Sequence, residues 1–221
     1  RSPVTEADKA VEAHLREVFD KHFPTFAFLG EETGKKESAS GLRFIVDPID
    51  GTRAFLRGIP TWSVLLGIEC DGVPVVGIAH FPADGDMLVG ATGHGVTHNG
   101  GRVAVSQVES LDDAVISHGS LLQFTGASMD ALLGALGRGT YTQRGFCDFD
   151  GYRKLLLGQV DAMIEPGIQA WDICPAAVLV REAGGRFTDF EGTDSIHSGT
   201  AIASNGRIHD ALLALVKRAV A

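Results

Sequence analysis

The stretch Asp47-Pro48-Ile49-Asp50-Gly51-Thr52 is the feature from which the fold and the chemistry of this chain can be inferred. It follows a short apolar run that predicts a buried strand, so both carboxylates leave a strand end. Proline fixes φ and interrupts regular strand pairing, which turns the backbone so that Asp47 and Asp50 can converge. Hard divalent cations prefer oxygen ligands of this kind. Gly51 and Thr52 open the next turn with N–H groups suited to an anion. The stretch therefore indicates a metal site joined to a phosphate site.

The same stretch also fits a plain turn. In an Asx or type I turn, an aspartate accepts a local backbone hydrogen bond and proline takes the following position. This alternative stays open when the hexapeptide is taken alone. Acidic residues elsewhere in the chain decide how much weight it carries.

The composition restricts the possible classes of protein. The 221 residues include 19 basic and 28 acidic side chains, a formal net charge of −9, which disfavours nucleic acid or an anionic membrane as the main partner. Three cysteines without a CxxC pair predict a reduced, cytoplasmic setting. No apolar run is long enough for a membrane span, and no signal peptide is visible. The chain begins at Arg1 without methionine, and we expect an N-terminal segment to be missing.

The order of the expected elements indicates an α+β protein in two closely packed halves, residues 1–110 and 111–221. Helical spacing begins at Thr5, a short strand is expected over 26–29, and a polar loop over 35–40. Hairpin spacing then predicts an antiparallel meander. Its expected strands are 62–70, 73–81, 87–91 and 102–106. The helices expected in the second half are 128–136, 151–157, 173–183 and 207–220, with short strands near 141, 162 and 201.

Further acidic residues lie at predicted element boundaries. Glu31 and Glu32 follow a glycine at a strand end. Asp172 precedes a helix with a proline near its start, where N-capping explains an aspartate equally well. Asp8 lies three residues after Thr5, so a capping box explains it without catalysis. A structural role therefore stays open for each of them beside a catalytic one.

Several motifs occur in an ordered series along the chain. They are residues 4–8 (VTEAD), 30–32 (GEE), 47–52 (DPIDGT), 165–172 (EPGIQAWD) and 181–185 (REAGG). Together they resemble the inositol monophosphatase superfamily of Mg²⁺-dependent, lithium-sensitive phosphatases, and the resemblance covers essentially the whole chain. It implies a layered α-β-α-β-α sandwich of the inositol monophosphatase/fructose bisphosphatase type and a homodimer. The implied activity is hydrolysis of a small phosphate monoester by a metal-activated water.

The resemblance also implies two or three Mg²⁺ ions. Glu31, Asp47 and the Ile49 carbonyl correspond to the ligands of the first ion. Asp47, Asp50 and Asp172 correspond to those of the second, so Asp47 bridges, and Glu31 reaches a third, weakly held ion. Because acids crowded in this way repel one another without metal, we expect a site that depends on metal outright.

The remaining catalytic roles follow from the same resemblance. Thr52 and Asp8 correspond to the pair that orients the attacking water, beside the catalytic Glu31. The Gly51 and Thr52 amides correspond to the phosphate cradle. Glu32 corresponds to a nearby acid that supports the metal ligands.

The substrate is predicted from the second half of the chain. Asp148, followed by Phe149, is similar to the bacterial histidinol-phosphatase branch, although Cys147 replaces the usual glycine before it. Histidinol phosphate carries an ammonium and an imidazole, and Asp148 with Glu165 could bind that cation. Several alternatives stay open. Glu165 also occurs in inositol phosphatases, Asp148 and Asp150 fit helix N-capping, and a catalytically silent relative would bind only metal or phosphate.

Overall fold

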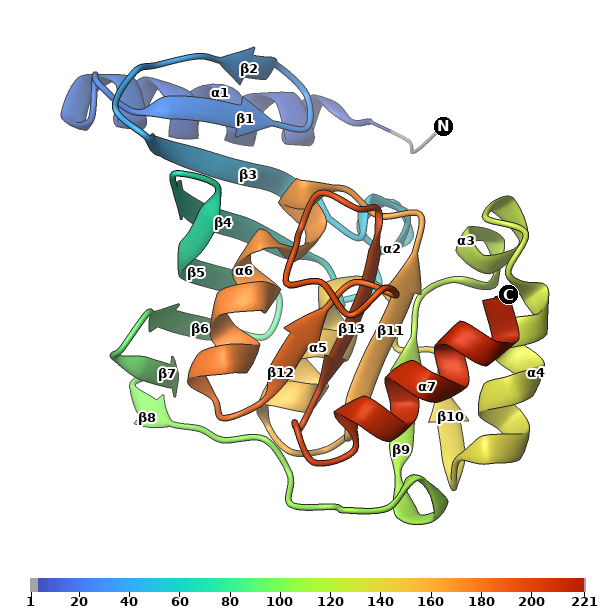
Figure 1. Cartoon of the computed structure of the whole chain (residues 1–221). Coiled ribbons are helices and arrows are strands. Elements are labelled where there is room, and N and C mark those ends of the chain that lie inside the picture. Colours follow the sequence, from blue (N-terminus) through green and yellow to red (C-terminus); the bar gives the residue numbers. More distant parts are fainter. Residues whose placement is uncertain (1–3, 221) are drawn as a thin grey trace.

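The computed structural model describes residues 4–220, which form two sheets with helices between and outside them (Figure 1). The first half contains α1 (Glu6–His22), β1 (Ala27–Gly30), β2 (Gly34–Lys36), β3 (Leu42–Asp50), α2 (Thr52–Leu56), β4 (Ser63–Cys70), β5 (Val73–Phe81), β6 (Asp86–Ala91), β7 (Gly95–His98) and β8 (Gly101–Arg102). The second half contains a 3-10 turn (Leu111–Asp113), β9 (Val115–His118), α3 (Leu121–Gly126), α4 (Asp130–Gly139), β10 (Thr142–Arg144), α5 (Asp148–Leu156), β11 (Ala162–Pro166), α6 (Ala170–Glu182), β12 (Arg186–Thr188), β13 (Thr200–Ser204) and α7 (His209–Val220). Within residues 4–220, no helix is both long and apolar enough to cross a membrane.

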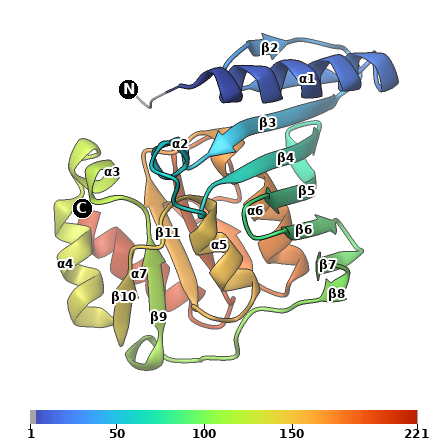
Figure 2. The ribbon, with the colours of Figure 1, turned by 180° about the vertical axis from the view of Figure 1, so that it is seen from behind.

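Helices and sheets alternate in layers. The eight-stranded sheet has the order β2-β1-β3-β4-β5-β6-β7-β8, and the five-stranded sheet has the order β10-β9-β11-β13-β12. Both are mixed, because β1 pairs with β3 in parallel and β9 pairs in parallel with β10 and β11. α1 covers the outer face of the first sheet, α5 and α6 lie between the sheets, and α3, α4 and α7 cover the second sheet (Figures 1 and 2). The predicted α-β-α-β-α layering is confirmed.

A row of glycines lets α6 lie directly on the first sheet. Gly67, Gly77 and Gly90 are paired across β4, β5 and β6. A Cβ on Gly77 would lie 2.6 Å from the Pro175 carbonyl oxygen, and a Cβ on Gly90 would lie 2.9 Å from a methyl of Leu179. These distances are shorter than van der Waals contact, so only glycine permits this approach. The row therefore sets the depth of α6 and of the cavity-facing residues at its start.

Parts of the expected pattern differ in the structure. The meander is present, but its last strand is only Gly101–Arg102, and residues 103–106 are not in a strand. The chain leaves the sheet there, since Val105 N bonds the carbonyl of Ala183 at 3.2 Å and the Ser106 hydroxyl bonds Asp161. The predicted polar loop over 35–40 begins with β2, which pairs with β1. Tertiary contacts thus end a strand that was expected over 103–106 and form a strand where a loop was expected.

A buried histidine connects α7 with the second sheet. His209 is fully buried, and its Nε2 lies 2.9 Å from the Thr188 hydroxyl while its Nδ1 lies 2.9 Å from the Ser204 hydroxyl. The Thr188 hydroxyl donates to the Asp189 carbonyl, so it accepts from Nε2. Burial lowers the pKa of His209 to about 4, with the charge of Arg186 acting in the same direction. The folded protein therefore holds the neutral imidazole.

This network predicts a specific loss of stability in acid. The folded pKa is about 4 and the ordinary value is 6.5. Between these values the unfolded chain binds the proton and the folded chain does not, so stability falls as the pH drops through this window. We expect the stability advantage of wild type over His209→Gln to shrink by up to about 3 kcal/mol between pH 7 and pH 4. Urea unfolding of both proteins at each pH measures it, and a pH-independent difference would contradict it.

Candidate active site

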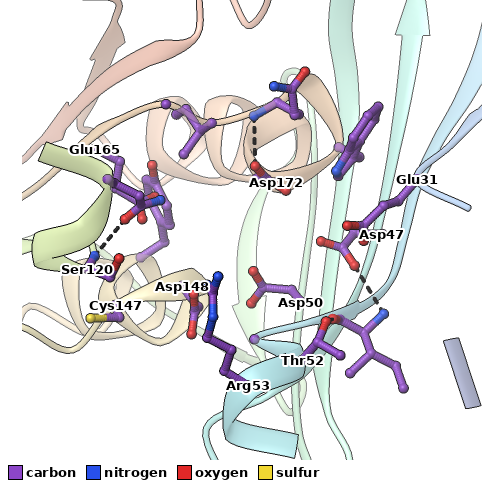
Figure 3. Close-up of a pocket in the computed structure, with 18 of the residues that line it drawn as sticks. Glu31, Asp47, Asp50, Thr52, Arg53, Ser120, Cys147, Asp148, Glu165 and Asp172 are labelled. Atoms are coloured by element: carbon purple, nitrogen blue, oxygen red, sulfur yellow. Dashed lines mark hydrogen bonds between the residues drawn. The ribbon is translucent and has the colours of Figure 1, made fainter. Parts of the chain in front are cut away.

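Six of the carboxylates predicted from the sequence line one cavity of about 620 Å³, whereas Asp8 and Glu32 do not line it (Figure 3). It lies where the ends of β1 and β3 meet the starts of α5 and α6. The lining residues are Glu31, Asp47, Ile49, Asp50, Gly51, Thr52, Arg53, Ser120, Leu122, Gln123, Cys147, Asp148, Tyr152, Glu165, Gly167, Ile168, Gln169, Trp171 and Asp172. The fold thus brings the metal-ligand candidates of one half and the substrate candidates of the other to one place.

The end of β3 places Asp47 and Asp50. The pairing of β3 with β4 shifts register between these residues, because Pro48 has no N–H to donate to a neighbouring strand. β3 nevertheless extends through Asp50, beyond the strand end expected before Asp47. Asp47 Oδ1 accepts a hydrogen bond from Ile49 N at 3.0 Å, so the local turn bond is present. Both carboxylates are also buried at the cavity, which a plain turn does not explain.

Gly51 and Thr52 turn the chain into the short helix α2. Gly51 has φ 78 and ψ 38, a left-handed conformation that costs glycine little. The Thr52 hydroxyl lies 3.0 Å from the Ile49 carbonyl oxygen and 3.5 Å from Asp8 Oδ1. Thr52 therefore connects the proposed backbone ligand with Asp8. The phosphate cradle at the two amides stays a prediction.

Asp8 has two neighbours. Its Oδ2 accepts hydrogen bonds from Thr5 N at 2.8 Å and from the Thr5 hydroxyl, which confirms the capping box. Its Oδ1 faces Thr52, and the side chain is fully buried. Because capping uses only one carboxylate oxygen, the other remains directed at the site. Capping and a role beside Thr52 are compatible.

Glu31 faces the cavity from the turn after β1, and Asp172 faces it from the first turn of α6. Burial, with the charges of Asp172 and Glu32 acting in the same direction, raises the pKa of Glu31 to about 7. Burial also raises the pKa of Asp172 to about 6, although Gln169 N donates a hydrogen bond to it at 2.7 Å. Asp172 therefore caps α6 from inside its first turn, whereas the N-cap position expected for it belongs to Gln169. Glu32 is not among the cavity-lining residues.

Asp47 and Asp50 also carry raised pKa values. For both the first cause is burial, and the neighbouring charges of Asp50 and Asp148, respectively, act in the same direction. Asp50 Oδ2 accepts hydrogen bonds from Phe149 N at 2.9 Å and from the Ser63 hydroxyl at 3.0 Å. Its other oxygen has no such donors among the described residues. The structure thus gathers negative charge that a cation would stabilise.

The donor set fits divalent cations in its chemistry. Within residues 4–220, no three side chains of aspartate, glutamate, histidine or cysteine converge on a common centre. The carboxylates surround the cavity without closing on one point. Oxygen donors, such as the buried carboxylates of Asp47 and Asp50, are nevertheless the ligands that hard divalent cations prefer.

Asp148 enters the cavity from the first residue of α5. Cys147 and Asp148 have φ values of 58 and 45, a region that non-glycine residues seldom occupy. Such strain occurs at sites where the backbone must place a side chain. Burial raises the pKa of Asp148, and the Arg53 guanidinium opposes this. The capping alternative for Asp148 and Asp150 is wrong, because the N-cap is Cys147, which makes no side-chain capping bond.

Glu165 forms the far wall of the cavity on β11. It is buried, and burial together with the charges of Asp172 and Asp148 holds its pKa well above the ordinary range. The Tyr152 hydroxyl lies beside it and is buried without a hydrogen-bond partner of ordinary geometry in the described part of the chain. A carboxylate and an unpaired hydroxyl therefore meet on the wall opposite the carboxylate cluster.

The cavity residues that were not predicted from the sequence as site residues include Arg53, Ser120, Gln123 and Tyr152. Arg53 directly follows the Gly-Thr pair, so its position in the motif was a usable signal. Gln123 caps α3 through a 2.6 Å bond from Ser120 N. Because α3 was not expected from the sequence pattern, nothing in the sequence marked Ser120 or Gln123 as a site residue.

Comparison with known proteins gives a consistent result. The model of the inositol monophosphatase family matches residues 1–221. A histidinol-phosphatase of Mycobacterium tuberculosis is 37% identical over 217 residues, 96% of this chain and 84% of that protein. A fructose-1,6-bisphosphatase/inositol-1-monophosphatase of Thermotoga maritima is 34% identical over 224 residues, 98% and 83% of the two chains. The structure of an inositol monophosphatase from Anabaena superposes with a TM-score of 0.90 at 31% identity, covering 98% and 88%. The chain belongs to the inositol monophosphatase family.

Proposed function

We propose that the protein is a Mg²⁺-dependent phosphomonoesterase that hydrolyses histidinol phosphate to histidinol and phosphate. The observation that carries the proposal is a single cavity with two acidic walls. One wall holds Glu31, Asp47, Asp50 and Asp172, the other holds Glu165, and Asp148 lies between them beside Asp50 and Arg53 (Figure 3). The first wall suits metal ions and a phosphoryl group, and the second suits a cationic alcohol.

The first wall would hold the ions. Glu31, Asp47 and the Ile49 carbonyl would bind one ion, and Asp47, Asp50 and Asp172 would bind a second, with Asp47 shared. Glu31 would also reach a third. When bound, such ions neutralise the phosphoryl oxygens and make water a stronger nucleophile.

The chain's own groups would orient the water and the phosphate. The Thr52 hydroxyl donates its hydrogen to the Ile49 carbonyl or to Asp8, which leaves its lone pairs to accept a hydrogen bond from water. The water oxygen can then face the phosphorus atom. The Gly51 and Thr52 amides would bind phosphoryl oxygens at the turn into α2. Orientation of this kind supplies much of the rate of phosphoryl transfer.

The second wall would select the leaving alcohol. Asp148 is partly offset by Arg53, whereas Glu165 faces the unpaired Tyr152 hydroxyl. Glu165 is therefore the better partner for the ammonium of histidinol, and a cation beside it would favour its ionised form. The Mycobacterium tuberculosis relative is named a histidinol-phosphatase, which supports this choice. The Thermotoga maritima relative favours inositol 1-phosphate as a second candidate, because Glu165 could accept a sugar hydroxyl instead.

A phosphate-release panel with Mg²⁺ tests the proposal. The substrates are histidinol phosphate, inositol 1-phosphate and fructose 1,6-bisphosphate. We expect the highest kcat/KM for histidinol phosphate. A preference for inositol 1-phosphate would contradict the proposed substrate and leave the proposed phosphomonoester hydrolysis standing. Release from none of them would indicate a silent relative that binds only metal or phosphate.

Glu165→Gln should weaken binding of histidinol phosphate and leave the rate of the hydrolysis step nearly unchanged. The substitution keeps the shape of a buried side chain and removes its charge. Losing about 2 kcal/mol from a charged hydrogen bond would raise KM for histidinol phosphate about 30-fold, with kcat changed much less. Inositol 1-phosphate, whose alcohol is neutral, serves as the internal control. Equal effects on both substrates would exclude Glu165 as the cation partner.

A further inference from the structure

Glu12 is a buried carboxylate in α1, one helical turn after Asp8. It is fully buried, although it lies in the middle of a helix. Its Oε2 accepts a hydrogen bond from Glu32 N at 2.9 Å, and its Oε1 accepts one from Thr33 N at 2.7 Å and one from the Thr33 hydroxyl. All three donors lie in the turn after β1. That turn carries Glu31 into the cavity.

The backbone before Glu31 rests on the same carboxylate. A Cβ added to Gly30 would overlap the carboxyl group of Glu12, so only glycine fits there while Glu12 keeps its position. Glu12 thus contacts the residue before Glu31 and bonds to the residues after it. One side chain fixes the backbone of Glu31 on both sides.

Burying the carboxylate of Glu12 costs more free energy than burying an apolar side chain at the same position. A buried carboxylate is expensive unless hydrogen bonds compensate for its lost hydration, and an apolar residue at a buried helix position would avoid that cost. The three donors from Glu32 and Thr33 supply the compensation. Arg16, one turn further along α1, donates to the Thr33 hydroxyl at 3.0 Å. α1 therefore directs a polar stripe, Asp8, Glu12 and Arg16, at the site and the turn beside it.

We propose that Glu12 is a positioning residue for the metal site. Its carboxylate sets the direction in which Glu31 enters the cavity, while Asp8 on the same helix faces Thr52. A single rigid helix then holds the proposed ligand Glu31 and the water-orienting pair in fixed relation to each other. The inference rests on the proposed function in taking Glu31 as a metal ligand.

Glu12→Gln tests the proposal by Mg²⁺ binding. In wild type each carboxylate oxygen of Glu12 accepts from a backbone N–H. The glutamine amide has only one acceptor oxygen, so its NH₂ group would face one of these N–H donors. Partners that orient metal ligands typically contribute 10- to 100-fold in affinity. We expect calorimetric titration with Mg²⁺ alone to show affinity weaker by about 10- to 100-fold. The Mg²⁺ concentration for half-maximal activity should rise in parallel, with KM for substrate nearly unchanged.

Three further variants separate positioning from stability. Thr33→Val removes one donor and should weaken Mg²⁺ binding, whereas Thr33→Ser keeps that donor and should bind as wild type does. Glu17→Gln, on the exposed face of the same helix, controls for the charge change. All titrations are made well below the melting temperature of each variant. If Glu12→Gln does not fold, the comparison of Thr33→Val with Thr33→Ser decides.

The outcomes distinguish the two proposals. Wild-type Mg²⁺ affinity in folded Glu12→Gln, or equal affinities in the two Thr33 variants, would overturn the positioning role even if wild type releases phosphate. Weaker Mg²⁺ binding in Glu12→Gln would uphold that role even if wild type releases no phosphate from any ester. A wild-type protein that binds no Mg²⁺ would overturn both.

Discussion

Replacing Asp47 with asparagine should lower kcat/KM for phosphate release by at least about 10³-fold. Asp47 is buried beside Asp50, Asp172 and Glu31, whose charges all act on its pKa. It is the carboxylate that the proposal assigns to both ions. Loss of about 4 kcal/mol of transition-state stabilisation would account for an effect of this size. Steady-state phosphate release with saturating Mg²⁺ measures it.

The same variant should be more stable than wild type when metal is removed. Burial and three neighbouring negative charges raise the pKa of Asp47, so its ionised form is unfavourable in the folded state. Asparagine removes the charge and can still accept the hydrogen bond from Ile49 N. A gain of about 1 to 2 kcal/mol would raise Tm by roughly 2–8 °C in a chain of this size.

Asp189→Asn provides the matched control. Asp189 is also buried, and its Oδ1 accepts backbone hydrogen bonds from Glu191 N and Thr193 N at 2.9 and 2.8 Å, but it does not line the cavity. This substitution should lower stability and leave kcat/KM unchanged. If Asp47→Asn kept full activity, the cavity would not be the site of hydrolysis.

Chelation of divalent ions should abolish activity and make stability depend on pH. The pKa is about 7 for Glu31 and about 6 for Asp172, against ordinary values of 4.5 and 3.8. Between the ordinary and the raised values the unfolded chain ionises while the folded protein keeps the proton. Stability of the metal-free protein therefore falls as the pH rises from about 4 to 7. After a discount for the partial exposure of Glu31, we expect a loss on the order of 2–4 kcal/mol.

Mg²⁺ should reverse that loss at neutral pH. An ion present at 100 times its Kd stabilises the folded state by about 2.7 kcal/mol. His209 acts in the opposite direction with pH, but it lies outside the cavity lining and contributes equally with and without metal. The difference between melts in EDTA and in Mg²⁺ at each pH therefore isolates the carboxylates. A difference that stays constant from pH 4 to 8 would contradict the prediction.

The part of the site that could be predicted from the sequence is carried by residues with local backbone signatures. Asp47 and Asp50 flank a proline, Asp172 caps a helix, and Glu31 follows a strand-ending glycine. All four line the cavity. Strand and helix periodicity is local and indicated the α+β class, whereas the layering was implied by the resemblance to the inositol monophosphatase superfamily.

The rest depended on contacts that leave no local pattern. Glu12 resembles any exposed helical glutamate in sequence, because its partners are backbone amides 20 and 21 residues away. Every residue except proline has a backbone amide, so the sequence does not show which amides will bind a side chain. α3 is only six residues long and exposes Leu121 and Leu122, so its apolar pattern does not indicate a buried face. Tyr152 was recognisable as a helix residue but not as one whose hydroxyl is left unpaired.

The carboxylates around the cavity come from distant parts of the chain, from Glu31 after β1 to Asp172 on α6. A chain emerging from the ribosome cannot present this donor set until α6 has been made and has docked on its row of glycines. If these carboxylates bind metal together, the ion would stabilise a fold that is already complete and would not nucleate folding.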